Sequence, residues 1–261
     1  MSDWIKFLGT AGARFVVSKQ LRFSGGTWCR LQEMNILIDP GPGTLLRCFA
    51  SRPKLDPEDL DAIILTHRHL DHSTDVNVMI EAMTRGTFNR RGALFAPVDA
   101  VEGEEPVVLR HTRQSVERLE LLQEGRRYQL GSLDFFVPVR HRHPVETYGL
   151  MFQLPRGRVA FISDTAYFPE LAGHYAHSDI IIINVVFFEL PPAREIQHLD
   201  LEGARALIRS IKPRLAVMTH FGMTMLNHKP YQLAQQLSEE TGTQVVAATD
   251  GMKLDLEKYL S

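Results

Sequence analysis

The chain has 261 residues, of which 44% are hydrophobic and 23% are charged, as in ordinary soluble globular proteins. This composition excludes a disordered chain, a collagen and a coiled coil. The 29 basic and 31 acidic residues leave a formal net charge of -2, without the basic excess that is usual in proteins that bind long nucleic acids.

Cysteine content and hydropathy exclude further classes of protein. Cys29 and Cys48 are too few for a disulfide framework or a cysteine-rich zinc site. The longest apolar run, Ile180–Phe188, is too short to span a bilayer. The first eight residues lack the basic and long apolar regions of a signal peptide. We therefore expect a cytoplasmic protein that has no membrane partner.

Apolar runs and turn residues predict two sets of strands, each followed by helices. The first set has strands at Ile5–Leu8, Thr27–Leu31, Ile36–Ile38 and Ala62–Leu65, and helices at Thr44–Ala50 and at Ser73–Arg85, with Ser73 or Thr74 as the N-cap. Residues 92–130 are expected to alternate between short strands and turns. The second set has strands at Leu133–Val139, Thr147–Leu154, Val159–Ile162, Ile180–Ile183 and Leu215–Met218, a helix at Leu201–Ile211 opened by Asp200, and a helix at Pro230–Ser238. Strands at Val245–Ala247 and Met252–Leu254 close the chain. This order predicts one α+β domain over residues 1–261, with two facing mixed sheets and helices outside them.

A cluster of metal-ligand residues follows the predicted strand Ala62–Leu65. His67, His69, Asp71 and His72 lie within six positions, directly before a predicted helix. His67 and His69 alternate, so in extended backbone they point the same way and can bind one metal ion. Asp71 and His72 lie where the chain turns into the helix and can reach a second ion. Three imidazoles and a carboxylate would be unsatisfied in a core without a cation.

The pattern His-x-His-x-Asp-His after a buried strand resembles the metallo-β-lactamase superfamily of metallohydrolases. Further segments resemble that family in the same order along the chain: Phe7–Gly12, Ile36–Gly41, His143–Gly149, Phe161–Thr165 and Met218–His220. The resemblance covers nearly the whole chain. It implies an αββα four-layer sandwich that holds its metal ions at one edge of the sheets.

The resemblance also implies a complete set of ligands. His67, His69 and His143 would bind one metal ion, Asp71, His72 and His220 would bind the other, and Asp164 would bridge the two. Imidazole and carboxylate ligands suit two divalent ions, with Zn²⁺ favoured and Mn²⁺ or Fe²⁺ as alternatives.

Several assignments stay open at this point. His141 competes with His143 for the third ligand position of the first metal, because both would lie on the same face of a strand, and the spacing to Tyr148-Gly149 favours His143. Asp39 and Asp250 end apolar runs, and each is either a turn residue or a carboxylate that orients a ligating imidazole. The remaining histidines, which have no partners in the sequence, are expected at the surface or satisfied in the core: His111, His174, His177 and His228.

Within the family, the chain resembles the branch of the phosphoribosyl cyclic phosphodiesterases and ribonuclease Z. The short spacing from His143 to Asp164 leaves no room for the substrate arm of ribonuclease Z, which disfavours tRNA processing. The segments Ile162–Ala166, His198–Leu201 and Thr249–Met252 resemble the phosphodiesterases, in which the residue at the position of His198 contacts the phosphate. Those enzymes also carry a structural zinc held by cysteines near the N-terminus, whereas this chain has only Cys29 there.

These observations predict a dinuclear metal-dependent phosphodiesterase that acts on a small phosphodiester, cyclic ones included. A hydroxide bridging the metals would attack phosphorus, with Asp71 and Asp164 holding the metals and His198 protonating the leaving oxygen. Alternatives are a hydrolase of a carboxylic ester, thioester, lactone or lactam, a tRNA 3′-processing endonuclease, and a non-catalytic metal-binding protein. A small phosphodiester or ester is the expected partner, long nucleic acid is not, and a homodimer stays open.

Overall fold

Two sheets form the middle of the molecule in the computed structural model, which describes residues 2–24, 26–192 and 196–260. The first sheet has the order β14-β1-β2-β3-β4-β5-β6, and the second has the order β13-β12-β11-β10-β9-β8-β7. The strands of the first sheet are β1 (Trp4–Phe7), β2 (Thr27–Leu31), β3 (Met34–Ile38), β4 (Ala62–Ile64), β5 (Ala93–Ala96), β6 (Arg118–Leu121) and β14 (Lys253–Asp255). Those of the second sheet are β7 (Arg127–Leu130), β8 (Leu133–Phe136), β9 (Leu150–Leu154), β10 (Gly157–Ile162), β11 (Ile180–Asn184), β12 (Leu215–Thr219) and β13 (Gln244–Ala247).

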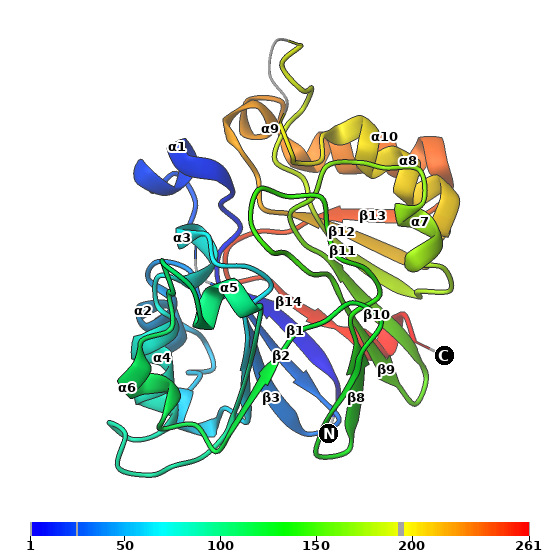
Figure 1. Ribbon diagram of the computed structural model, residues 1–261. Coiled ribbons are helices and arrows are strands. Elements are labelled where there is room, and N and C mark those ends of the chain that lie inside the picture. The colour runs from blue at the N-terminus through cyan, green and yellow to red at the C-terminus, as the bar shows by residue number, and fades with distance from the viewer. Residues whose placement is uncertain (1, 25, 193–195, 261) are drawn as a thin grey trace.

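Helices cover the outer face of each sheet, so that the molecule has four layers (Figure 1). The α-helices of the described residues are α1 (Ala13–Ser18), α2 (Thr44–Ala50), α3 (Leu70–Ser73), α4 (Val76–Met83), α5 (Val98–Val101), α6 (Arg110–Arg113), α7 (Leu171–His174), α8 (Leu201–Ile211), α9 (Met223–Asn227) and α10 (Pro230–Thr241). Within the described ranges, no helix is long and apolar enough to cross a membrane.

The apolar core has three parts that match this layering. Phe95, Phe135 and Phe152 belong to the cluster between the two sheets. Leu207 of α8 belongs to the cluster outside the second sheet, and Ile80 of α4 to the cluster outside the first. Burial of apolar side chains on both faces of each sheet explains why the central strands are apolar runs without alternation. The predicted αββα sandwich of two mixed sheets is confirmed.

Both sheets place a block of parallel strands beside a block of antiparallel strands. In the first sheet β3, β4, β5 and β6 are parallel neighbours, and in the second sheet β10, β11, β12 and β13 are. Carboxyl ends of parallel strands meet at one edge, where loops can form a site. Asp39, Asp164 and His220 lie within two residues of these ends.

The single helix predicted over Ser73–Arg85 is wrong, because the chain forms α3 and α4 with a break at Thr74 and Asp75. Neither predicted N-cap acts as one. The Ser73 hydroxyl donates back to the carbonyl oxygens of Arg68 and His69, and the Thr74 hydroxyl donates to that of Leu70. Such local bonds compete with capping.

Two other segments differ from the prediction. Residues 92–130 contain the short helices α5 and α6 in addition to strands. The strands predicted at Leu133–Val139 and Thr147–Leu154 are shorter, and residues 141–147 form a loop, closed by the His141 amide donating to the Thr147 carbonyl oxygen at 2.8 Å. His141 and His143 therefore do not share one face of a strand.

Candidate metal centre

Eight polar side chains from separate segments meet at the edge where the parallel strands end. They are His67, His69, Asp71 and His72 from the segment after β4, together with His143, Asp164, His198 and His220 from the second half of the chain. Four groups of three among the described residues offer ligand atoms that lie within 4.8 Å of one another, and two of these groups consist of predicted metal ligands alone. One group is His67, His69 and His143, and the other is Asp71, His72 and His220. The structure thus brings the six side chains together in the two predicted triads.

Asp164 lies between the two triads and is almost fully buried. Its Oδ2 atom is 3.8 Å from Nε2 of His67, in the first triad, and 3.6 Å from Nε2 of His72, in the second. Its Oδ1 atom is 3.5 Å from Nδ1 of His220. One carboxylate therefore faces both triads, as the predicted bridging role requires.

Hydrogen bonds on the outer nitrogens orient two of the imidazoles. Nδ1 of His72 is 2.9 Å from a carboxylate oxygen of Asp39, and Nδ1 of His143 is 2.8 Å from the carbonyl oxygen of Gln197. Both partners only accept, so Nδ1 carries the hydrogen in each ring. In each neutral ring the lone pair is then on Nε2. Nε2 of His72 lies 2.9 Å from Nε2 of His220, and Nε2 of His143 lies 3.0 Å from Nδ1 of His69.

His67 is oriented by the hydroxyl of Thr66. That hydroxyl donates to Asp39 at 2.7 Å and lies 3.1 Å from His67 Nδ1, so it accepts from the ring. Within the part of the chain that the structure describes, neither the buried inner nitrogen of His67, Nε2, nor Nδ1 of His220 has a hydrogen-bond partner. Buried nitrogens of this kind are costly unless a cation takes their lone pairs. The residues therefore fit divalent metal ions.

Burial and charge set the protonation of the first triad. Burial, followed by the charge of His72, lowers the pKa of His67 well below its ordinary value. Burial lowers the pKa of His69 to about 4, and the nearby His143 adds to that effect. Burial also lowers the pKa of His143, against an opposing effect of Asp164. Unprotonated imidazoles are the form that binds metal ions.

Negative charge gathers around His72 of the second triad, at Asp71, Asp39 and Asp164. Burial would raise the pKa of Asp164, but His220, His198 and His72 outweigh it and hold that pKa well below its ordinary value. Burial opposes protonation of His72, but Asp71, Asp39 and Asp164 outweigh burial and raise its pKa. Asp164 is therefore ionised and draws positive charge to this side of the centre.

Backbone geometry holds Asp39 and His220 in place. Both have left-handed backbone conformations, with φ of 53° and 60°. A Cβ atom on Gly12 would lie 2.4 Å from Nδ1 of His220, so only glycine leaves room for this ring. Strained conformations of this kind gather at functional sites.

His198, the predicted proton donor, lies beside the triads. Its Nδ1 atom is 3.4 Å from Oδ2 of Asp164 and has no hydrogen-bond partner among the described residues. Burial lowers its pKa, and the charge of Asp164 opposes that effect. His143, Asp164 and His198 also form a group whose ligand atoms lie within 4.8 Å of one another, so His198 is close enough to be a ligand itself.

The structure distinguishes between the histidines and aspartates whose roles the sequence left open. His141 is buried, its Nε2 lies 2.7 Å from the Tyr175 hydroxyl, and it belongs to none of the ligand groups found among the described residues, so His143 joins His67 and His69. Asp39 contacts a candidate ligand, His72, whereas Asp250 accepts from the Thr10 hydroxyl and the Phe23 amide. The four histidines without sequence partners are exposed: His111, His174, His177 and His228.

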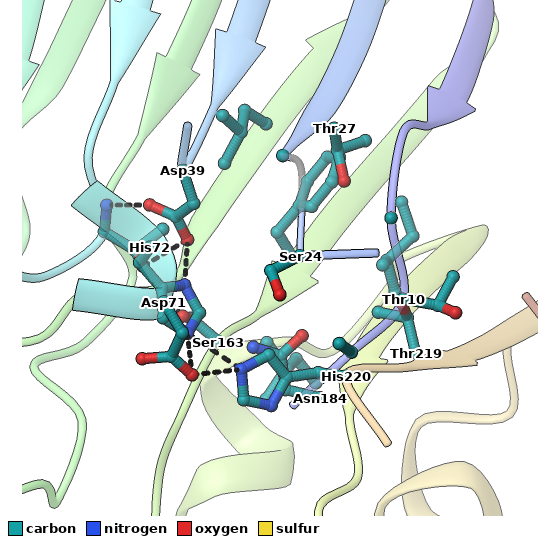
Figure 2. Close-up of a pocket in the computed structure, with 18 residues that line it drawn as sticks. Thr10, Ser24, Thr27, Asp39, Asp71, His72, Ser163, Asn184, Thr219 and His220 are labelled. Atoms are coloured by element: carbon teal, nitrogen blue, oxygen red, sulfur yellow. Dashed lines mark hydrogen bonds and ion pairs between the residues drawn. The ribbon is translucent and has the colours of Figure 1, made fainter. Parts of the chain in front are cut away.

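Asn184 was not expected at the site. Its side-chain amide donates to Oδ1 of Asp164 at 2.8 Å. The only signal in the sequence is a polar residue that interrupts the apolar run Ile180–Phe188. Asn184 also lines a pocket next to the second triad, where Asp39, His72 and His220 are joined by contacts and Ser24 lies beside them (Figure 2).

Comparisons with known proteins agree with this architecture. A family profile described as "Beta-lactamase superfamily domain" matches residues 34–221. A protein of Methanocaldococcus jannaschii, described as uncharacterized, is 31% identical over 97% of this chain and 94% of its own length. The metallo-beta-lactamase fold protein YhfI of Bacillus subtilis has a TM-score of 0.78 at 17% identity, covering 98% of this chain and 100% of that protein. A diphosphatase from the PhnP family has a TM-score of 0.69 at 20% identity, covering 97% of both chains.

Proposed function

The chain belongs to the beta-lactamase superfamily and is a metallohydrolase, and from this premise we propose that it is a dinuclear metal-dependent phosphodiesterase for small phosphodiesters. The observation that carries the proposal is the position of Asp164. This one carboxylate faces both triads and is also 3.4 Å from His198, a histidine outside the metal motif.

Two divalent cations would be held by His67, His69 and His143 on one side, by Asp71, His72 and His220 on the other, and by Asp164 between them. We favour Zn²⁺, with Mn²⁺ or Fe²⁺ as alternatives, because the donors are imidazoles and carboxylates. When bound, such a pair lowers the pKa of water and neutralises negative charge on a phosphoryl group.

The chain's own residues supply orientation and a proton. Asp39 and the Gln197 carbonyl hold the rings of His72 and His143 with Nε2 directed inward. Asn184 holds one oxygen of Asp164. His198 has Nδ1 toward Asp164, so Nε2 is the atom that would pass a proton to the leaving oxygen.

Phosphodiester chemistry is favoured over acyl chemistry by the likeness to a protein that acts at phosphorus, and His198 is compatible with both. An alkoxide that leaves phosphorus or an acyl carbon needs a proton, and the imidazole beside Asp164 can deliver one. One protein of the same fold is a diphosphatase, which also acts at phosphorus. Hydrolysis of a carboxylic ester, thioester, lactone or lactam on the same residues is the competing outcome. We expect no long nucleic acid as a substrate.

A hydrolysis panel on metal-reconstituted protein tests the proposal. It contains activated phosphodiesters, 2′,3′- and 1,2-cyclic phosphates, lactones and thioesters, with Asp164→Ala as the inactive control. We expect two metal equivalents by elemental analysis and turnover of at least one diester. Turnover of acyl substrates alone would replace the phosphodiesterase by an acyl hydrolase. At most one metal equivalent would exclude the dinuclear mechanism.

A further inference from the structure

Arg68 lies between His67 and His69 in the sequence, and its side chain contacts two acidic residues that are not candidate metal ligands. Its Nε atom is 3.3 Å from Oδ2 of Asp99 in α5, and its Nη1 atom is 3.1 Å from Oε2 of Glu105. The Arg68 side chain is 28% exposed and that of Asp99 is 31% exposed, whereas Glu105 is 79% exposed. Because solvent screens exposed ion pairs, the contact with Asp99 is the stronger restraint on Arg68.

Asp99 also holds the loop that carries His143. Its Oδ2 atom accepts a hydrogen bond from the backbone amide of Glu146 at 3.0 Å. In return, the Glu146 carboxylate accepts from the Asp99 amide at 3.4 Å. The same carboxylate oxygen of Asp99 is therefore shared by the two segments that supply the first triad.

The loop is fixed at its far end as well. The Tyr148 hydroxyl donates to the Glu146 carboxylate at 2.6 Å, and the Tyr148 amide donates to the Thr66 carbonyl oxygen at 3.1 Å. Tyr148 is almost fully buried. Contacts from Arg68 through Asp99, Glu146 and Tyr148 to Thr66 thus hold the His143 loop to the His67–His69 segment at two points.

We propose that Asp99 is a positioning residue that sets the spacing between the His67–His69 segment and the His143 loop, and so determines the metal affinity of the first triad. This inference rests on the proposed metal centre but not on the identity of the substrate. Residues that orient ligands from behind commonly change metal affinity by about 10–100-fold when they are replaced. The second triad shares none of these contacts and is expected to keep its affinity.

The test measures stepwise binding of Co²⁺ to the full chain, by competition with a chromophoric chelator and by the visible absorption of the bound ion. The variants are Asp99→Ala, which loses both contacts, and Asp99→Asn, which can keep the bond from the Glu146 amide. Glu105→Gln is the matched control, because it removes the other carboxylate partner of Arg68 without touching the His143 loop. His69→Ala identifies the binding step that belongs to the first triad.

We expect Asp99→Ala to weaken that step by about 10–100-fold and to change its absorption spectrum, with a smaller loss in Asp99→Asn. The other step and the Glu105→Gln variant should match the wild type. Three outcomes would overturn the inference. Asp99→Ala could weaken both binding steps equally or leave the step of the first triad unchanged, or Glu105→Gln could weaken that step as much as Asp99→Ala does. If the wild type binds two Co²⁺ ions but hydrolyses no phosphodiester, the proposed function is rejected while the inference about Asp99 still stands or falls on the binding data.

Discussion

Asp39 connects three groups at the level of single atoms. Its Oδ1 accepts from the Thr66 amide at 2.6 Å, and its Oδ2 faces both the Thr66 hydroxyl and Nδ1 of His72. Since Thr66 in turn contacts His67, one carboxylate orients a ring in each triad. All of these partners donate, so the residue must offer acceptors on both of its oxygens.

Asp39→Asn replaces one of these acceptors with a donor, and we expect it to weaken metal binding and turnover by about 10–100-fold. The matched control is Asp250→Asn, because Asp250 also holds loop groups but contacts no candidate ligand among the bonds described above. Metal content after dialysis and melting temperature are the two measurements. The control should melt earlier while keeping its metal. An equal loss of metal in both variants would contradict the orienting role of Asp39.

His198→Ala separates proton transfer from binding. If His198 protonates the leaving group, the variant should keep both metal ions and lose about 10²–10⁴-fold in rate on an alkyl diester. A nitrophenyl diester needs little protonation, so its loss should be smaller. Rates are compared with the wild type at saturating metal. Equal losses on both substrates would reduce His198 to a binding role, and loss of a metal ion would make it a ligand.

The candidate ligands were predictable because most lie in short motifs at strand ends. His67, His69, Asp71 and His72 occupy one short segment, and its spacing suffices to group them. Asn184 and Asp99 were not predictable as contributors, because their contacts with Asp164 and Arg68 join segments far apart in the sequence. Single polar residues in or after apolar strands carry no spacing signal.

At the level of elements, Asp200 caps α8 as predicted. Its side chain accepts from the Gly203 amide at 2.8 Å, which satisfies one of the free amides at the start of the helix. The cap was predictable because both the residue type and the contact are local. The break between α3 and α4 was not predictable, because Asp75 is bonded to a residue of another helix. Its carboxylate accepts from the Leu45 amide at the start of α2.

Asp200→Ala should cost about 0.5–2 kcal/mol of folding free energy, through loss of the N-cap. Chemical denaturation of the metal-loaded protein measures that cost, and metal content should stay at the wild-type level. Glu202→Gln is the control, since Glu202 is an exposed first-turn residue that does not cap the helix. A stability equal to the wild type would show that the Gly203 amide finds another partner.

At the level of the whole molecule, the centre joins the two halves of the sandwich. His67, His69, Asp71 and His72 follow β4 of the first sheet, whereas Asp164 and His220 follow β10 and β12 of the second. The order of strands predicted that two sheets face each other, because each half of the sequence repeats the pattern of strands and helices. The contact across the halves depends on which strand ends meet, and local periodicity does not contain that information.

A metal pair that joins both sheets should stabilise the folded chain as a whole. The unfolded chain lacks the assembled triads, so free metal at about 100 times the Kd of a site adds about 2.7 kcal/mol to the free energy of unfolding for each bound ion. For a chain of this size, that amount raises the melting temperature by about 5–10 °C. The measurement is thermal unfolding after chelation and after readdition of Zn²⁺ or Mn²⁺. Asp164→Ala, which lacks the shared carboxylate, should recover only part of the increase. A wild type that melts at the same temperature with and without metal would contradict a centre that holds the two sheets together.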